Sequence, residues 1–137
     1  MSDIYESLDT ALYSTLAGGT ALTTLLGGTA VYYGKAPDDA NLPYVIWSYQ
    51  GGGDENMTAN RTKNVLIYVR AYAETAKAAK QLDAAIDGLL HLQTVTVSGW
   101  TNIWTARETD IQQPETDPAG VTTWAAGAFY RVRLDQN

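Results

Sequence analysis

The sequence predicts an α+β domain in which a mixed, mainly antiparallel sheet carries the N-terminal and central helices on one face. Three observations support this fold class. Residues 64–92 join an apolar strand to an amphipathic helix almost without a break, a second amphipathic helix opens the chain, and the remaining apolar segments are short and rich in β-branched and aromatic residues. The expected strands are residues 30–33, 44–50, 64–73, 94–98, 101–108 and 123–134. We expect residues 1–137 to form a single domain.

The composition excludes several classes of function. Nine Lys and Arg against 15 Asp and Glu give a net charge of -6, which opposes tight binding to a phosphate backbone. The chain has no Cys, so it has no disulfide, thiolate nucleophile or sulfur metal site. The acidic N-terminus does not have the form of a signal peptide, and no apolar run approaches the length of a membrane span. We therefore expect no association with a membrane.

The N-terminal segment predicts a helix and then a second, shorter one. Asp3 and Glu6 have the spacing of a capping box, and Gly18 and Gly19 end the first helix. Thr20 is expected to cap the second helix, residues 21–26. The apolar side of the first helix is a single stripe, formed by Ile4, Leu8, Ala11, Leu12 and Leu16.

The strand at residues 64–73 is expected to be central, because both of its faces are largely apolar. Before it, residues 51–62 are Gly-rich and polar and predict a flexible loop that projects from the sheet. One face of the strand carries Val65, Ile67, Val69, Ala71 and Ala73, and the other carries Leu66, Tyr68, Arg70 and Tyr72.

The helix after this strand is predicted to begin at a Thr75 cap. Its apolar stripe is formed by Ala79, Leu82, Ile86, Leu89 and Leu90. Charged residues lie off that stripe and are expected to face solvent: Lys77, Lys80, Asp83 and Asp87.

The C-terminal third predicts a hairpin, a loop and a last strand. Ser98 and Gly99 form a tight turn between the strands at 94–98 and 101–108. Residues 111–121 contain two Pro and a Gly and predict a second projecting loop. In the last strand, Gly127 is expected to mark a bulge. One face of that strand carries Trp124, Ala126, Ala128, Tyr130, Val132 and Leu134, and the other carries Phe129, Arg131 and Arg133.

No catalytic, cofactor-binding or metal site is predicted. His91 is the only imidazole and is interpreted as structural. The neighbouring acids Asp38–Asp39 and Asp54–Glu55 are expected to diverge, so they do not form a catalytic carboxylate pair. The glycine run 51–53 is followed by acids rather than by Lys and Ser or Thr, which excludes a phosphate-binding loop.

Several segments together resemble the tail completion family of long-tailed phages and prophages, also called tail-to-head joining or tail terminator proteins. They are the N-terminal helices, the segment VYYGKAPDDANLPYVIWSY, the strand and helix VLIYVRAYAETAKAAKQLDAAIDGLL, and the closing FYRVRL. The most characteristic step is Tyr33-Gly34-Lys35-Ala36-Pro37, followed by Leu42-Pro43-Tyr44-Val45.

The resemblance implies a structural virion protein rather than an enzyme. It implies a ring, usually of six subunits, at the junction of tail and neck, assembled in the host bacterial cytoplasm. The implied partners are further copies of the chain, the tail tube protein and a head connector or stopper protein. An acidic lumen would let DNA pass without specific binding, because like charge opposes phosphate.

We expect the two polar loops to make the contacts with these partners, because they are long and punctuated by Gly or Pro. The candidate interaction residues are Gly51, Gly52, Gly53, Asp54, Glu55, Gln112, Gln113, Glu115 and Asp117. Two alternatives stay open: a neighbouring neck component, such as a stopper or adaptor on the portal side, and a small enzyme whose scattered carboxylates converge in the fold.

Overall fold

The structure, a computed structural model, describes residues 4–56, 59–116, 120 and 122–137. Its elements are α1 (Ile4–Ala17), α2 (Thr20–Leu26), β1 (Val31–Tyr33), β2 (Tyr44–Glu55), β3 (Thr62–Ala73), α3 (Ala76–Leu90), β4 (Trp100–Thr116) and β5 (Thr122–Gln136). Of the two residues of the predicted capping box, Glu6 lies in the first turn of α1 and Asp3 lies outside the described residues.

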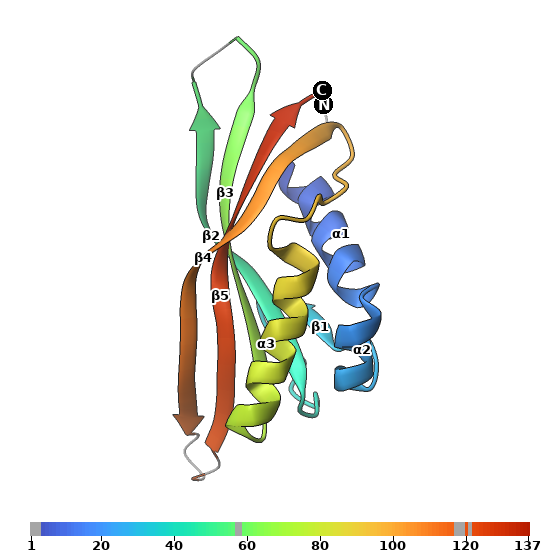
Figure 1. Cartoon of the computed structure of the whole chain (residues 1–137), viewed down its shortest axis with the longest axis vertical. Helices are drawn as coiled ribbons and strands as arrows, with labels where there is room; N and C mark the ends of the chain where they lie inside the picture. Colours follow the sequence, from blue (N-terminus) through green and yellow to red (C-terminus); the bar gives the residue numbers. More distant parts are fainter. Residues whose placement is uncertain (1–3, 57–58, 117–119, 121) are drawn as a thin grey trace.

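The sheet has the strand order β1-β2-β3-β5-β4. Among the described strands, β1 and β2 pair in parallel, and the other pairings are antiparallel. Figure 1 shows a long, twisted sheet with all three helices on one side. This confirms the predicted fold class, and it confirms β3 as the central strand.

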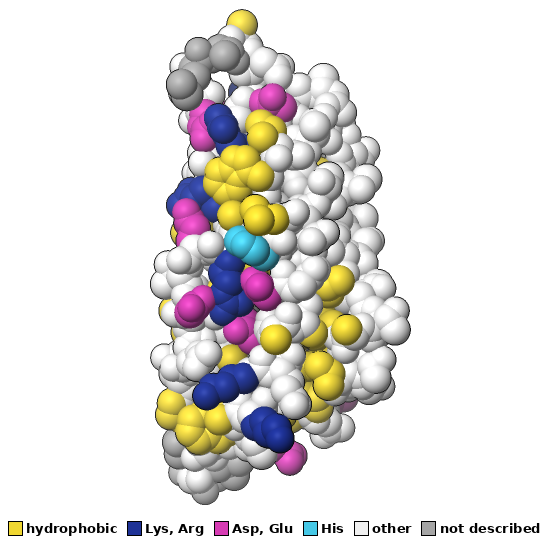
Figure 2. All heavy atoms as spheres, in the orientation of Figure 1, with side chains coloured by type: hydrophobic (Ala, Val, Ile, Leu, Met, Phe, Trp, Pro, Cys, Tyr) yellow, Lys and Arg dark blue, Asp and Glu magenta, His cyan; other side chains and the backbone are white. Residues whose placement is uncertain are grey.

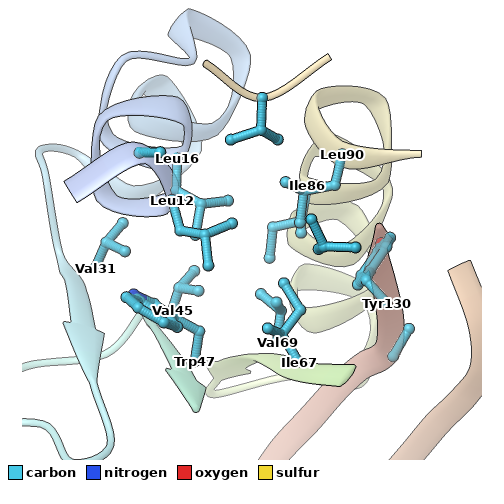
Figure 3. Close-up of a cluster of buried hydrophobic side chains, with 14 of the residues drawn as sticks. Leu12, Leu16, Val31, Val45, Trp47, Ile67, Val69, Ile86, Leu90 and Tyr130 are labelled. Atoms are coloured by element: carbon cyan, nitrogen blue, oxygen red, sulfur yellow. The ribbon is translucent and has the colours of Figure 1, made fainter. Parts of the chain in front are cut away.

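The core lies between the helices and the sheet. The predicted stripe of α1 is buried in full, and on β3 and β5 the residues that alternate toward the helices are buried with it. Figure 3 shows Leu12 and Leu16 facing Ile86 and Leu90 across the helical layer, above Val45, Trp47, Ile67 and Val69 of the sheet. The 3.6-residue and 2-residue periods of the sequence therefore identify the buried faces.

The helix caps are partly as predicted. Thr75 caps α3, and its side chain accepts a hydrogen bond from the Ala78 N–H at 3.1 Å. The expected Thr20 cap is wrong, because α2 begins at Thr20 and its cap is Gly19, whose backbone is extended. A Cβ at position 19 would lie 2.4 Å from a methyl carbon of Leu89, so a larger residue here would require the Leu89 side chain to move.

The two hairpins of the sheet are longer than the sequence indicates. β2 continues through Glu55 and β4 continues through Thr116, so about half of each predicted loop is paired strand. In contrast, the predicted strand at residues 94–98 is absent, and only Val97 forms an isolated bridge, to Trp100. Gly99 still makes the expected tight turn, with a φ of 82°.

Gly127 does not mark a bulge. Its pairing with Arg70 continues the regular β3–β5 register, and the irregularities lie in β2 and β4 instead. A Cβ at position 127 would lie 2.1 Å from the Val69 carbonyl oxygen. Glycine is required here because β3 and β5 approach each other closely.

Candidate interaction surfaces

The candidate interaction residues lie on two hairpin arms. The β2–β3 arm comprises residues 51–55 with their partners 62–66, and the β4–β5 arm comprises residues 111–116 with their partners 122–127. Figure 1 shows the arms at opposite ends of the long axis of the molecule. The structure thus brings each predicted set together but places the two sets far apart. Asp117 lies outside the described residues.

The β2–β3 arm is exposed from Gly51 to Asp54, although these residues are strand rather than loop. A Cβ on Gly52 would lie 3.0 Å from the Tyr5 hydroxyl and 3.1 Å from the Asn64 carbonyl oxygen, so the strand passes close to α1 at this point. Asp54 forms ion pairs with Lys63 at 3.3 Å and with Arg61 at 3.6 Å. These pairs fix the arm across its two strands.

Glu55 belongs to a ladder of polar side chains that crosses four strands. Its carboxylate accepts hydrogen bonds from Asn64 of β3 and Arg133 of β5, both at 2.9 Å. Arg131 of β5 donates to Asn64 at 2.6 Å and to Glu108 of β4 at 2.7 Å. The hydrogen bonds from Asn64 and then Arg133 hold the pKa of Glu55 below its ordinary value. The arm is therefore tied to the rest of the sheet by charge.

The β4–β5 arm carries Gln112, Gln113 and Glu115. Gln112 and Gln113 line a hollow of about 180 Å³ against α3, together with Lys80 and Trp124. Glu115 lines a wider hollow of about 490 Å³ that also includes Tyr44, Tyr72 and the loop from Lys35 to Ala40.

A cluster around Arg107 was not predicted. Its guanidinium donates to both carboxylate oxygens of Asp83, at 3.0 and 2.8 Å, and lies 3.5 Å from Asp87 and 2.6 Å from Asp110. The buried Tyr130 hydroxyl accepts from Arg107 at 3.1 Å. Hydrogen bonding to Asp83 raises the pKa of Arg107, and burial raises the pKa of Tyr130.

The cluster joins α3 to the edge strand β4. Asp83 and Asp87 were expected to face solvent, but Asp83 is buried. The overlooked signal is the spacing of Asp83, Asp87 and His91, which lie four residues apart and therefore share one side of α3. Figure 2 shows acidic and basic side chains gathered beside the single imidazole on this side of the molecule.

The remaining polar candidates have structural contacts. His91 Nδ1 accepts a hydrogen bond from the Arg107 backbone N–H at 3.1 Å, which agrees with its structural interpretation. Asp54 and Glu55 diverge to different partners, as expected. Within the described ranges, no group of three or more His, Cys, Asp or Glu residues is arranged to hold a metal ion. None of the described helices is long and apolar enough to cross a membrane.

Two solved structures share the fold. A chain from the virion of a native gene transfer agent particle aligns with a TM-score of 0.80 at 17% identity, covering 98% of this chain and 99% of that one. The gp17 protein of bacteriophage SPP1 aligns with a TM-score of 0.57 at 18% identity, covering 96% of this chain and 90% of that one. A search of curated protein sequences gives no match. The chain therefore shares its fold with a chain of that virion particle and with SPP1 gp17.

The family follows from the sequence itself. Residues 10–126 match the family described as tail completion protein gp17, which is most of the chain. The chain belongs to this family, as the segments around Tyr33-Gly34-Lys35-Ala36-Pro37 indicate, and it is a structural tail protein of the virion. Gly34, with a φ of 74°, turns the chain so that Ala36 packs against a small cluster formed by Ile46, Tyr72 and Ala125.

Proposed function

We propose that this chain forms a ring, of six copies, that ends the tail tube and joins it to the head connector or stopper. In this role it is a scaffold for contacts and not an enzyme. The observation that carries the proposal is the placement of the two hairpin arms at opposite ends of the long axis. A protein that joins two structures needs two separate contact surfaces, and each arm supplies one.

The composition of the arms supports this assignment. Gly51, Gly52 and Gly53 leave the backbone of the β2–β3 arm accessible, and Gln112 and Gln113 present neutral hydrogen-bonding groups at the other end. Such surfaces suit protein contacts better than binding of a nucleic acid, which requires clustered cations. The net charge of -6 is compatible with DNA passing through the ring without being held.

Electron microscopy of the purified protein with tail tubes tests the proposal. We expect rings of uniform size at the tube ends. Alanine substitutions at Gln112 and Gln113, or glycine replacement of Asp54, should leave the rings intact and weaken attachment on one side only, tube or connector. A control substitution, Thr24→Ala on the exposed side of α2, lies on a helix that packs against α1 and α3 and should change neither. Bare tubes with wild-type protein would refute the proposal.

A further inference from the structure

The face of the sheet opposite the helices is the least covered surface of the fold. We call it the open face, and it comprises Leu66, Tyr68, Arg70 and Tyr72 of β3 with Phe129, Arg131 and Arg133 of β5. None of the three described helices packs against it (Figure 1). The loop after β1 covers only the corner around Ile46 and Tyr72, so Tyr68, Arg70 and Phe129 remain partly exposed.

Arg70 is unusual on this face. Its guanidinium lies 4.5 Å from the ring centre of Tyr68 and 5.8 Å from that of Tyr72, and Tyr68 packs on Phe129 at 4.7 Å. Its Nε atom is buried and has no hydrogen-bond partner within the described part of the chain. A buried donor without an acceptor is costly. Because the Nε atom is covered, a carboxylate from a partner would meet the other guanidinium nitrogens of this partly exposed side chain.

The other cations of the open face are already neutralised. Arg131 pairs with Glu108 and Arg133 pairs with Glu55. Arg70 forms no ion pair with any described residue, and Glu115, which lies on the same face, stays beyond ion-pair distance. Arg70 is therefore the cation of this face that lacks a carboxylate partner among the described residues, and it lies beside an aromatic cluster.

An acidic helix lies on the opposite side of the molecule. α1 has no Lys or Arg, and its outward side exposes Glu6, Thr10 and Tyr13. Asp9 is already hydrogen-bonded to Tyr49 at 2.6 Å, whereas Glu6 is exposed and forms no ion pair with a described residue. Beside α1, a hollow of about 360 Å³ is lined by aromatic and polar residues that include Tyr13, Tyr33 and Trp47. This surface is opposite in charge to Arg70 of the open face, and both surfaces carry exposed or partly exposed aromatic side chains.

We infer that the open face of one copy binds the outward side of α1 of the next copy, with Glu6 of the second copy accepting a hydrogen bond from Arg70 of the first. The inference rests on the proposed ring. Because the two surfaces lie on opposite sides of the sheet, their contact is head-to-tail, and repeated head-to-tail contacts close a ring when the rotation between successive copies divides a full circle. The stacked Tyr68 and Tyr72 rings hold the guanidinium in place for a carboxylate.

Cross-linking of single-cysteine variants tests the contact directly, because the natural chain contains no Cys. Glu6→Cys and Arg70→Cys chains are each treated with a short thiol cross-linker, alone and mixed, under conditions in which the wild-type protein forms rings. We expect cross-linked dimers in the mixture and none with either variant alone. A mixture of Glu6→Cys with Lys77→Cys, an exposed position on α3, is the matched control and should give none.

A charge-reversal pair gives an independent readout. Arg70→Glu or Glu6→Arg should each weaken ring formation at least about tenfold, and the double variant Glu6→Arg/Arg70→Glu should restore it. Lys77→Glu changes the net charge as Arg70→Glu does and should have no effect. Circular dichroism confirms that each variant is folded.

The outcomes separate this inference from the proposed function. Rings that form without the 6–70 cross-link, or that tolerate Arg70→Glu, overturn the inference and leave the ring intact, as expected if the open face lines the lumen or meets another tail protein. Wild-type protein that forms no ring, alone or on tube ends, overturns the proposed function and the inference with it.

Discussion

Arg107 and Asp83 form a two-pronged ion pair that joins the edge strand β4 to helix α3, with both carboxylate oxygens accepting at 3.0 and 2.8 Å. The two side chains are only 18% and 10% exposed. β4 is the last strand of the sheet and has a partner on one side only. The ion pair therefore gives this edge strand a contact with α3 in addition to its pairing with β5.

Removing one member of this pair should destabilise the fold strongly. Asp83→Ala leaves the Arg107 guanidinium with poorer partners in a largely buried site, and we expect a loss of about 3 kcal/mol in the free energy of unfolding. Asp110→Ala removes a contact of the same guanidinium, but the Asp110 side chain is 73% exposed, so its effect should stay below about 1 kcal/mol. Urea unfolding of both variants measures the difference, and equal losses would contradict the assignment.

The β2–β3 arm should loosen in acid. The pKa of Glu55 is lowered below its ordinary 4.5 by Asn64 and then Arg133, so its contribution to stability is complete above pH 4.5 and is lost as the pH falls through the folded-state value. The side-chain amide of Asn64, which donates to Glu55, reports this titration by NMR. We expect a midpoint below 4.5, and no titration in Glu55→Gln. A titration midpoint at or above pH 4.5 would show that the hydrogen bonds from Asn64 and Arg133 do not stabilise the Glu55 carboxylate.

The fold should lose stability in strong base through Tyr49. Burial and then the hydrogen bond to Asp9 raise its pKa above the ordinary 10.0, so the folded chain keeps a proton that the unfolded chain releases. Stability is fully present below pH 10 and declines above it. Tyr49→Phe should make that decline shallower, at a cost of about 1 kcal/mol at neutral pH. Thermal melts from pH 8 to roughly pH 11 measure the slope, and an unchanged slope would exclude this role.

Gly127 should not tolerate a side chain. A Cβ there would lie 2.1 Å from the Val69 carbonyl oxygen and 2.8 Å from Arg70 Cα, so Gly127→Ala must push β3 and β5 apart. We expect a loss of about 1 to 3 kcal/mol in the free energy of unfolding. Gly53→Ala is the control, since nothing lies within 4 Å of its added Cβ. Similar losses in the two variants would show that the close approach is unimportant.

The arms show where reasoning from sequence stops short. Residues 51–55 and 111–116 contain Gly, Pro and polar side chains, which have low strand propensity, so they resemble loops. In the structure they are strands because their neighbours extend the register and supply hydrogen bonds. Residues 94–98 have the opposite character, since they alternate in hydrophobicity but find no strand partner beyond the Val97 bridge.

The amino-acid sequence was sufficient to predict the fold class, the central position of β3, the buried stripes of α1 and α3 and the inward face of β5. These follow from periodicity, because a buried face needs apolar residues at a fixed interval along one segment. Three features follow from the tertiary structure alone: Asp83 is buried beside Arg107, the two arms lie at opposite ends, and Arg70 has a donor that no described residue accepts. Each of these depends on groups far apart in the chain, and distance through space is set by strand order and register rather than by any local pattern.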